Sequence, residues 1–343
     1  MKSKLISAFK VAFFLSLGIG LIFLFTRQFG EEEKQEIINA ITHADYSWII
    51  LSMVFGTLAH ISRAMRWKQL LEPMGHNPST RNTFFAVMVM YFANLAIPRL
   101  GEVSRCAILR RYEKVPMEKS FGTVVAERAI DLVVLGLIFL FTLAIQWDMV
   151  MDGFKAIQGL GAKNEADAEK SNWFLPTLAI VGLSVGGILF LFRKNARIQL
   201  IYSKVLSLIM GFVSGLKSAF KVKKPLTFLA HSIFIWLMYF VMVYICFFSI
   251  PQTSELPWLS GFTILIFGSL GIILVPGGIG IYPLIVAKVL FLYGVEEIYG
   301  YGFGWIVWIG QTALLLFWGI LSLILLPVFN RKKPIDAEIF TPQ

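Results

Sequence analysis

The sequence predicts an all-α fold: a polytopic helical membrane protein of two inverted repeats, with six full spans and two re-entrant helix pairs. Hydrophobic residues make up 57% of the 343 residues and charged residues 15%, which is more apolar than an ordinary soluble domain. Apolar segments long enough to cross about 30 Å of hydrocarbon recur along the chain. The basic residues gather in a few connecting segments, as the positive-inside rule describes.

The first two predicted spans are Phe9–Thr26 and Tyr46–Ser62. Lysines precede the first apolar run and no small-residue cleavage site follows it, so we interpret it as a retained span rather than a signal peptide. Residues 27–45 carry five acids and two bases and are placed outside, whereas residues 63–81 carry four bases and one acid and are placed inside. The N-terminus is therefore expected in the cytoplasm, beneath a bacterial inner membrane.

The third apolar segment, Asn82–Ile97, is followed by a basic stretch at 99–119 with six bases and three acids. A full crossing would place this stretch outside and reverse the charge preference of the later loops. We therefore predict that residues 82–112 enter from the cytoplasmic side and return to it. The turn is expected at Pro98 and Gly101, because proline and glycine interrupt a helix.

After this turn, Ser120–Trp147 is predicted to cross outward and Phe174–Phe192 to cross back, followed by an outward crossing at Leu226–Phe248. Residues 193–224 carry eight bases and no acid, so they belong inside. Within them, residues 198–220 have the spacing of an amphipathic helix that lies on the inner leaflet.

A second interruption follows Leu259–Val275, at the glycine-rich sequence 276–280. Leu284–Tyr293 is too short to cross, since a spanning helix needs about 20 residues. This pattern predicts a second re-entrant pair that enters from outside. Phe303–Leu326 is then the last span, and residues 331–343 are expected to form a disordered cytoplasmic tail.

Residues 1–330 thus read as one integral membrane domain with two halves, 1–150 and 174–328. Each half contains two spans, a re-entrant pair and a further span, in opposite orientations. Interrupted hydrophobic segments at corresponding positions of two inverted halves indicate the binding site of a transporter.

Charged residues inside these apolar segments are a second functional signal. An isolated charge at mid-membrane costs about 2.5–3.5 kcal/mol on insertion scales, so such residues pair or line a wet cavity. Arg63 and Arg66 are three positions apart on one helical face, beside Trp67, and two guanidiniums can hold a phosphodiester bidentately. For Arg63 alone, anchoring at the inner interface is the simpler explanation.

The first turn and the span after it contain most of the other candidates. Free backbone N–H groups at a broken helix bind anions, which favours a functional turn over one merely stabilised by an Arg–Glu pair. In the span, Arg128 is expected to offset the repulsion between Glu127 and Asp131. This triplet is either a clamp that docks the span or a relay for a proton or headgroup. The candidates are Asn94, Pro98, Arg99, Gly101, Glu102, Arg105, Glu127, Arg128 and Asp131, and the charged ones are expected to converge on one hydrated pocket.

Signatures of other functions are absent from the sequence. It contains no phosphate-binding loop, zinc-protease motif or nucleophile elbow, and no cofactor or metal is expected. Cys106 and Cys246 lie far apart and indicate neither a disulfide framework nor a metal site. The formal net charge of +10 reflects membrane topology, and nucleic acid is not an expected partner.

Four motifs resemble those of the lysylphosphatidylglycerol synthase transmembrane-region family and occur in the same order. The resemblance covers roughly residues 1–330. The motifs are R-A-x-R-W-x-x-L-L at 63–71, N-L-A-I-P-R-L-G-E-V-S-R at 94–105, E-R-x-x-D at 127–131 and P-G-G-I-G at 276–280. The resemblance implies a flippase-like region, which in the best-understood relatives moves an aminoacylated phospholipid between leaflets. A separate cytosolic domain makes that lipid in those relatives. No such domain follows here, so aminoacyl-lipid synthesis is not expected.

The resemblance also implies substrate contacts at the second turn, through Pro276, Gly277, Gly278 and Gly280. Relatives usually carry an acid at the position of Pro283, so this chain departs from the pattern there. Lys288 is expected to supply a cation near the turn or to extend to the membrane interface.

The sequence leaves three functions open. In the first, the protein moves a phospholipid or polyprenyl-phosphate-linked lipid between leaflets, with membrane lipids and a lipid- or glycan-modifying enzyme as partners. In the second, it is an intramembrane enzyme that uses Glu102, Glu127 or Asp131 as acid or base. In the third, it is a structural partner of an envelope enzyme.

Overall fold

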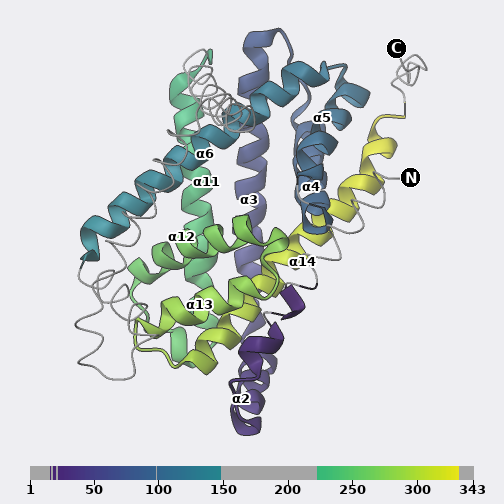
Figure 1. Ribbon diagram of the computed structural model, residues 1–343. Helices are drawn as coiled ribbons and strands as arrows, with labels where there is room; N and C mark the ends of the chain where they lie inside the picture. The colour runs from purple at the N-terminus through teal and green to yellow at the C-terminus, as the bar shows by residue number, and fades with distance from the viewer. Residues whose placement is uncertain (1–15, 17, 21, 98, 148–221, 332–343) are drawn as a thin grey trace, which may run out of the picture.

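The computed structural model describes residues 16, 18–20, 22–97, 99–147 and 222–331, which are helical with no strand among them (Figure 1). Four helices in this part are long and apolar enough to cross a membrane: Tyr46–Met74, Met117–Ile145, Pro225–Ser249 and Glu297–Phe329. They coincide with four of the six spans predicted from the sequence. The predicted span Phe174–Phe192, the interfacial helix 198–220, almost all of the tail and much of Phe9–Thr26 lie outside the described residues.

Helix α2 (Glu31–Thr42) lies in the acidic segment 27–45, which was expected to be a connecting loop outside the membrane. Its three glutamates at 31–33 occupy the first turn, where the helix dipole favours negative charge. The carboxylate of Glu33 also accepts a hydrogen bond from the backbone N–H of Gly30 at 2.7 Å. Ile37 is buried on the side that packs against α14, so this connection is an ordered helix rather than a loop.

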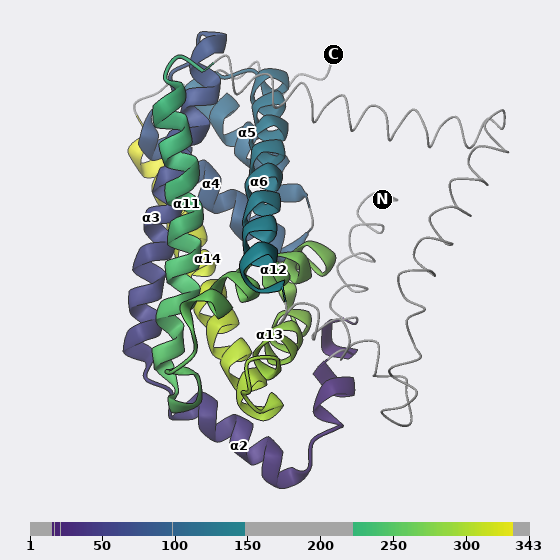
Figure 2. The ribbon, with the colours of Figure 1, turned by 90° about the vertical axis from the view of Figure 1, so that its left-hand side faces the viewer.

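Helices α3 (Tyr46–Leu71) and α11 (Pro225–Cys246) pack side by side along their length (Figure 2). Asp45 caps α3 by accepting from the backbone N–H of Ser47 at 3.0 Å. The helix continues nine residues beyond the predicted end of the span at Ser62. The arginines that were expected in an inner interfacial segment therefore lie within the helix and are buried.

The first predicted interruption is present between α4 (Thr80–Ala96) and α5 (Leu100–Glu113). At 17 and 14 residues, these helices are roughly 26 and 21 Å long, shorter than a bilayer core of about 30 Å. The side chain of Asn94 accepts a hydrogen bond from the N–H of Gly101 at 2.8 Å, which closes the turn. Arg99 in the turn has a φ of 65°, a left-handed conformation that is uncommon outside glycine.

The second interruption separates α12 (Trp258–Leu274) from α13 (Ile281–Phe291), with a short 3₁₀ turn at Pro276–Gly278. Gly277, Gly278 and Gly280 all have positive φ values between 69° and 75°, so this turn depends on glycine. Figure 1 shows α4 and α5 in the upper part of the molecule and α12 and α13 in the lower part. The two turns meet where the end of α4 contacts the 3₁₀ turn.

Helices α6 (Met117–Ile145) and α14 (Glu297–Phe329) complete the described part. α14 contacts α2, α3, α4 and α13, and so joins both hairpins. The two helix interruptions therefore occur in the predicted segments, between Ala96 and Leu100 and at 275–280, although Gly101 lies in the first turn of α5 rather than before it. That these hairpins are re-entrant stays a prediction. Their entry from opposite membrane faces and the inverted symmetry remain predictions.

A topology experiment tests these predictions in a variant whose two buried cysteines are replaced by alanine. A single cysteine at Glu296, which is exposed before α14, should react with a membrane-impermeant maleimide in intact cells. A cysteine at Glu72, which follows the C-terminal end of α3, should react only after permeabilisation. Labelling of position 72 in intact cells would contradict the predicted orientation.

Candidate functional site

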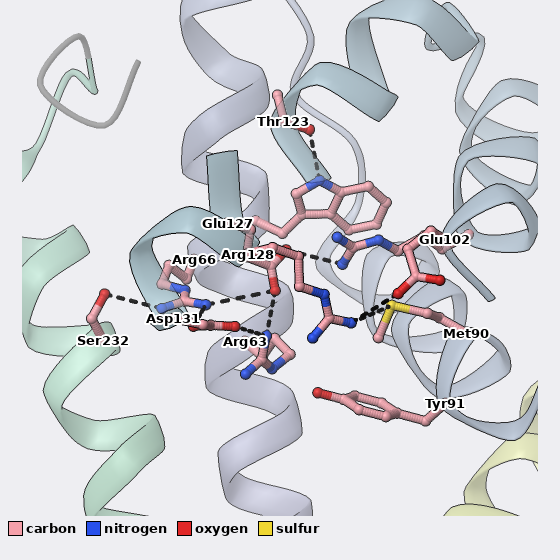
Figure 3. Close-up of polar contacts among 12 residues, drawn as sticks. Arg63, Arg66, Met90, Tyr91, Glu102, Thr123, Glu127, Arg128, Asp131 and Ser232 are labelled. Carbon is pink, nitrogen blue, oxygen red and sulfur yellow. Dashed lines mark hydrogen bonds and ion pairs between the residues drawn. The ribbon is translucent and has the colours of Figure 1, made fainter. Parts of the chain in front are cut away.

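Two buried arginines of α3 face two carboxylates of α6 (Figure 3). One nitrogen of Arg63, Nη1, donates to Glu127 Oε1 at 2.6 Å and to Asp131 Oδ2 at 2.7 Å. Arg66 donates from Nη2 to Asp131 Oδ1 at 2.6 Å, and the same nitrogen lies 3.6 Å from Glu127 Oε1. The arginine pair that was expected to be free to hold a phosphodiester is thus already held by carboxylates.

Glu127 also joins the first hairpin to this pair. Its second oxygen, Oε2, accepts a hydrogen bond from Arg105 Nη1 of α5 at 2.9 Å. The guanidinium of Arg105 in turn lies over the ring of Trp67, 4.3 Å from its centroid, and the indole donates to Thr123 at 2.8 Å. One fully buried carboxylate therefore docks α6 onto both α3 and α5, and the relay role remains a prediction.

Arg128 occupies the edge of the same cluster. Its Nη2 lies 3.2 Å from Glu102 Oε1 of α5, and 41% of its side chain is exposed. Asn94 donates to the same oxygen of Glu102 at 3.3 Å. The ion pairs that bridge Glu127 and Asp131 come from the two arginines of α3, and the expected contribution of Arg128 to offsetting their repulsion stays a prediction.

These ion pairs bring four guanidiniums and three carboxylates together, a formal surplus of one positive charge. All four carboxylate oxygens of Glu127 and Asp131 are engaged by guanidinium nitrogens. In contrast, Nε and Nη2 of Arg105 are buried and have no hydrogen-bond partner among the described residues. We call this set the guanidinium network: Arg63, Arg66, Glu102, Arg105, Glu127, Arg128 and Asp131.

The structure leaves other predicted site residues outside the network. Arg99 is exposed in the first turn and forms no ion pair with the network, so five of the six charges expected to converge do so. Lys288 lies on α13 about two turns beyond Gly280, where it is half-exposed and pairs with Glu297. The hydrated pocket and the contacts of these residues with a substrate remain predictions, and Pro98 lies outside the described residues.

The second turn is held by a residue that the sequence did not single out. Trp308 of α14 donates from its indole nitrogen to the carbonyl oxygen of Gly277 at 2.7 Å. Leu95, near the end of α4, lies 3.6 Å from the position that a Cβ at Gly277 would occupy. No sequence signal identifies Trp308, because its partner is a backbone carbonyl 31 residues away.

An aromatic group borders the network on the side of Arg63. It consists of His60 on α3, Tyr91 on α4, and Trp236 and Tyr239 on α11. The rings of His60 and Tyr91 lie 4.7 Å apart between centroids, and those of Trp236 and Tyr239 lie 6.0 Å apart. The only sequence signal is that His60 precedes Arg63 by one helical turn.

Comparisons with known proteins find related membrane proteins. The family model described as "Lysylphosphatidylglycerol synthase TM region" matches residues 8–319. A UPF0104 membrane protein of Methanothermobacter thermautotrophicus is 23% identical over 268 residues, which cover 71% of this chain and 75% of that protein. One of Methanocaldococcus jannaschii is 28% identical over 128 residues, only 36% of this chain and 37% of that protein. No solved structure matches.

Proposed function

We propose a transport function for this chain, which belongs to the lysylphosphatidylglycerol synthase TM region family, as its motifs indicated. In this proposal, it moves a lipid with a phosphate headgroup, either a phospholipid or a polyprenyl-phosphate-linked lipid, between the leaflets of a bacterial inner membrane. The proposal puts both termini on the cytoplasmic side. The main support is the guanidinium network, in which four arginines meet three carboxylates inside a membrane-type helix bundle.

A surplus guanidinium in such a bundle suits a monoanionic phosphodiester. Buried charges are costly unless they are paired, so an unmatched positive charge favours an anionic ligand. Arg128 is the best placed to receive it, because it is half-exposed and its ion pair with Glu102 is longer than the closest ion pair of each buried arginine. The planar guanidinium can bind two phosphate oxygens together.

In the proposed path, the headgroup passes between the two hairpin turns while the acyl chains stay in the lipid. Arg99 would meet the headgroup at the first turn, and the glycines at 277–280 would let backbone N–H groups approach it at the second. Arg63 and Arg66 would act through their charge rather than by direct contact, because their ends are held by carboxylates. Net movement needs a gradient or a downstream sink, since a path without a bias only equilibrates the leaflets.

The arrangement of the acids favours transport over the enzyme alternative. A general acid or base must reach a substrate proton through a hydrogen bond. In Glu127 and Asp131 all four oxygens already accept from arginines, which leaves none directed at a substrate. Glu102 retains one buried oxygen without a partner among the described residues, but it also pairs with Arg128.

Transbilayer movement of a labelled lipid in liposomes tests the proposal. The purified protein should move phosphatidylglycerol or a polyprenyl phosphate faster than empty vesicles do. Arg128→Gln should slow this movement about tenfold or more, because a hydrogen bond to a charged group contributes about 1.5–3 kcal/mol. Arg128→Lys, which keeps the charge, should lose less.

The matched control is Arg110→Gln, an exposed arginine on α5, which should leave the rate unchanged at equal protein incorporation. If none of a panel of phospholipids and polyprenyl phosphates moves faster than in empty vesicles, the transport proposal is wrong.

A further inference from the structure

The aromatic group lies directly against the guanidinium network. The guanidinium carbon of Arg63 is 6.0 Å from the ring centroids of both Tyr91 and Tyr239. In Figure 3, the hydroxyl of Tyr91 points toward the guanidiniums of Arg63 and Arg128. A ligand phosphate at Arg128 would therefore have the ring of Tyr91 beside it, and the other rings of the group follow next to Tyr91 and Arg63.

Several polar atoms of these rings have no hydrogen-bond partner, or only a distant one, among the described residues. Nδ1 of His60 and Nε1 of Trp236 are buried and have no hydrogen-bond partner among the described residues. The hydroxyls of Tyr91 and Tyr239 are 3.5 Å apart, beyond the usual O–H···O range of about 2.5–3.0 Å. Buried polar atoms in proteins are nearly always paired with protein, water or ligand. This group therefore offers several hydrogen-bonding atoms within an aromatic surface.

The charge beside the group decides which headgroups fit. The network carries a surplus positive charge, and the oxygens of Glu127 and Asp131 are already engaged by arginines. Arg63 also occupies the position near both tyrosine rings that a ligand cation would take in a cation–π contact. An ammonium group on the headgroup would therefore meet like charge and find no free oxygen on Glu127 or Asp131. The oxygen without a partner on Glu102 is buried, and that carboxylate already pairs with Arg128.

We propose that His60, Tyr91, Trp236 and Tyr239 bind a neutral hydroxylated headgroup, a sugar or polyol, next to the phosphate. The aromatic faces cover the C–H surface of such a group, and the buried ring nitrogens and hydroxyls bond its hydroxyls. This inference rests on the proposed function for its substrate class. It selects lipids with an anionic phosphate and an uncharged polyol over aminoacylated or other cationic lipids.

Thermal unfolding of the purified full chain in detergent tests the inference with soluble headgroups. The probes are inorganic phosphate, glycerophosphoinositol and glycerophosphocholine, because a ligand that binds the native state raises Tm according to its affinity. Glycerophosphoinositol should bind about tenfold more tightly than inorganic phosphate, the effect of one or two added hydrogen bonds. Glycerophosphocholine should bind no more tightly than phosphate.

The double variant Trp236→Phe/Tyr239→Phe keeps an aromatic ring at each position and removes two polar ends. It should bind inorganic phosphate as the unmodified protein does and lose the advantage of glycerophosphoinositol. Tyr244→Phe is the matched control on the same helix, where the ring stacks on Phe240 at 5.8 Å between centroids, and it should keep that advantage.

Three results would overturn the inference: stabilisation by none of the probes, a preference for glycerophosphocholine, or an advantage of glycerophosphoinositol that survives in the double variant. Failure of the transport proposal can be told apart from failure of this inference. It would appear as an absence of lipid movement in liposomes even if the soluble headgroups bind with the expected selectivity.

Discussion

Replacing Glu127 by glutamine should lower the free energy of unfolding by about 3–5 kcal/mol, the usual cost of removing one partner from a buried ion pair. The side chain is fully buried, and its two oxygens accept hydrogen bonds from Arg63 and Arg105. Glutamine keeps the shape but leaves Arg63 and Arg66 with Asp131 as their remaining carboxylate, and it removes the carboxylate that pairs with Arg105. The docking of α6 on α3 and on α5 should weaken together.

Thermal unfolding of the detergent-purified variants measures this effect. Glu118→Gln is the matched control, since Glu118 is exposed in the first turn of the same helix, and its Tm should barely change. Combining Glu127→Gln with Arg105→Gln should cost less than the sum of the two single changes, because the residues are directly coupled. Equal Tm values for the variants at 127 and 118 would show that the network does not hold these helices together.

Gly101→Ala should be the second most damaging change, at about 3 kcal/mol, the upper end of what overpacking usually costs. A Cβ at this position would lie 2.1 Å from the carbonyl oxygen of Met90 and 2.7 Å from Oδ1 of Asn94. Neither atom can give way easily, because one is helical backbone and the other accepts the hydrogen bond that closes the turn. The α4–α5 hairpin should therefore open, and lipid movement should fall with it.

Gly122→Ala provides the comparison, since nothing lies within 4 Å of a Cβ there and helix propensity favours alanine. That variant should be as stable as the unmodified protein or slightly more stable. If Gly101→Ala unfolds at the same temperature as Gly122→Ala, the close contact between α4 and α5 does not exist in the membrane.

The two helix interruptions were predictable because their signals are local. A proline followed closely by glycine stands at both turns, and the glycines of the second turn adopt the positive φ values that only glycine tolerates well. α2 was missed because its acids were read only as a topology signal. The same three glutamates at 31–33 favour a helix N-terminus, which is a second local signal in the same residues.

The true extent of α3 and the pairing of its arginines were not predictable in the same way. Arg63 and Arg66 look like the end of a span when read alone. Their burial depends on Glu127 and Asp131, which follow more than 60 residues later and reach them only through tertiary packing. The aromatic group was unpredictable for the same reason, since tertiary packing brings its four rings together from three helices that are separate in the sequence.

The charge count of the guanidinium network has an electrical consequence under the proposed function. With four arginines and three carboxylates, the empty network carries one positive charge, and a bound monoanionic phosphodiester makes it neutral. Moving one elementary charge through the whole membrane field is worth about 2.3 kcal/mol per 100 mV. A voltage that is negative inside therefore acts on the empty protein and draws its site back toward the cytoplasmic leaflet. The electrical work of exporting an anionic lipid is then done during the return of the unloaded protein, and the lipid itself crosses without sensing the field.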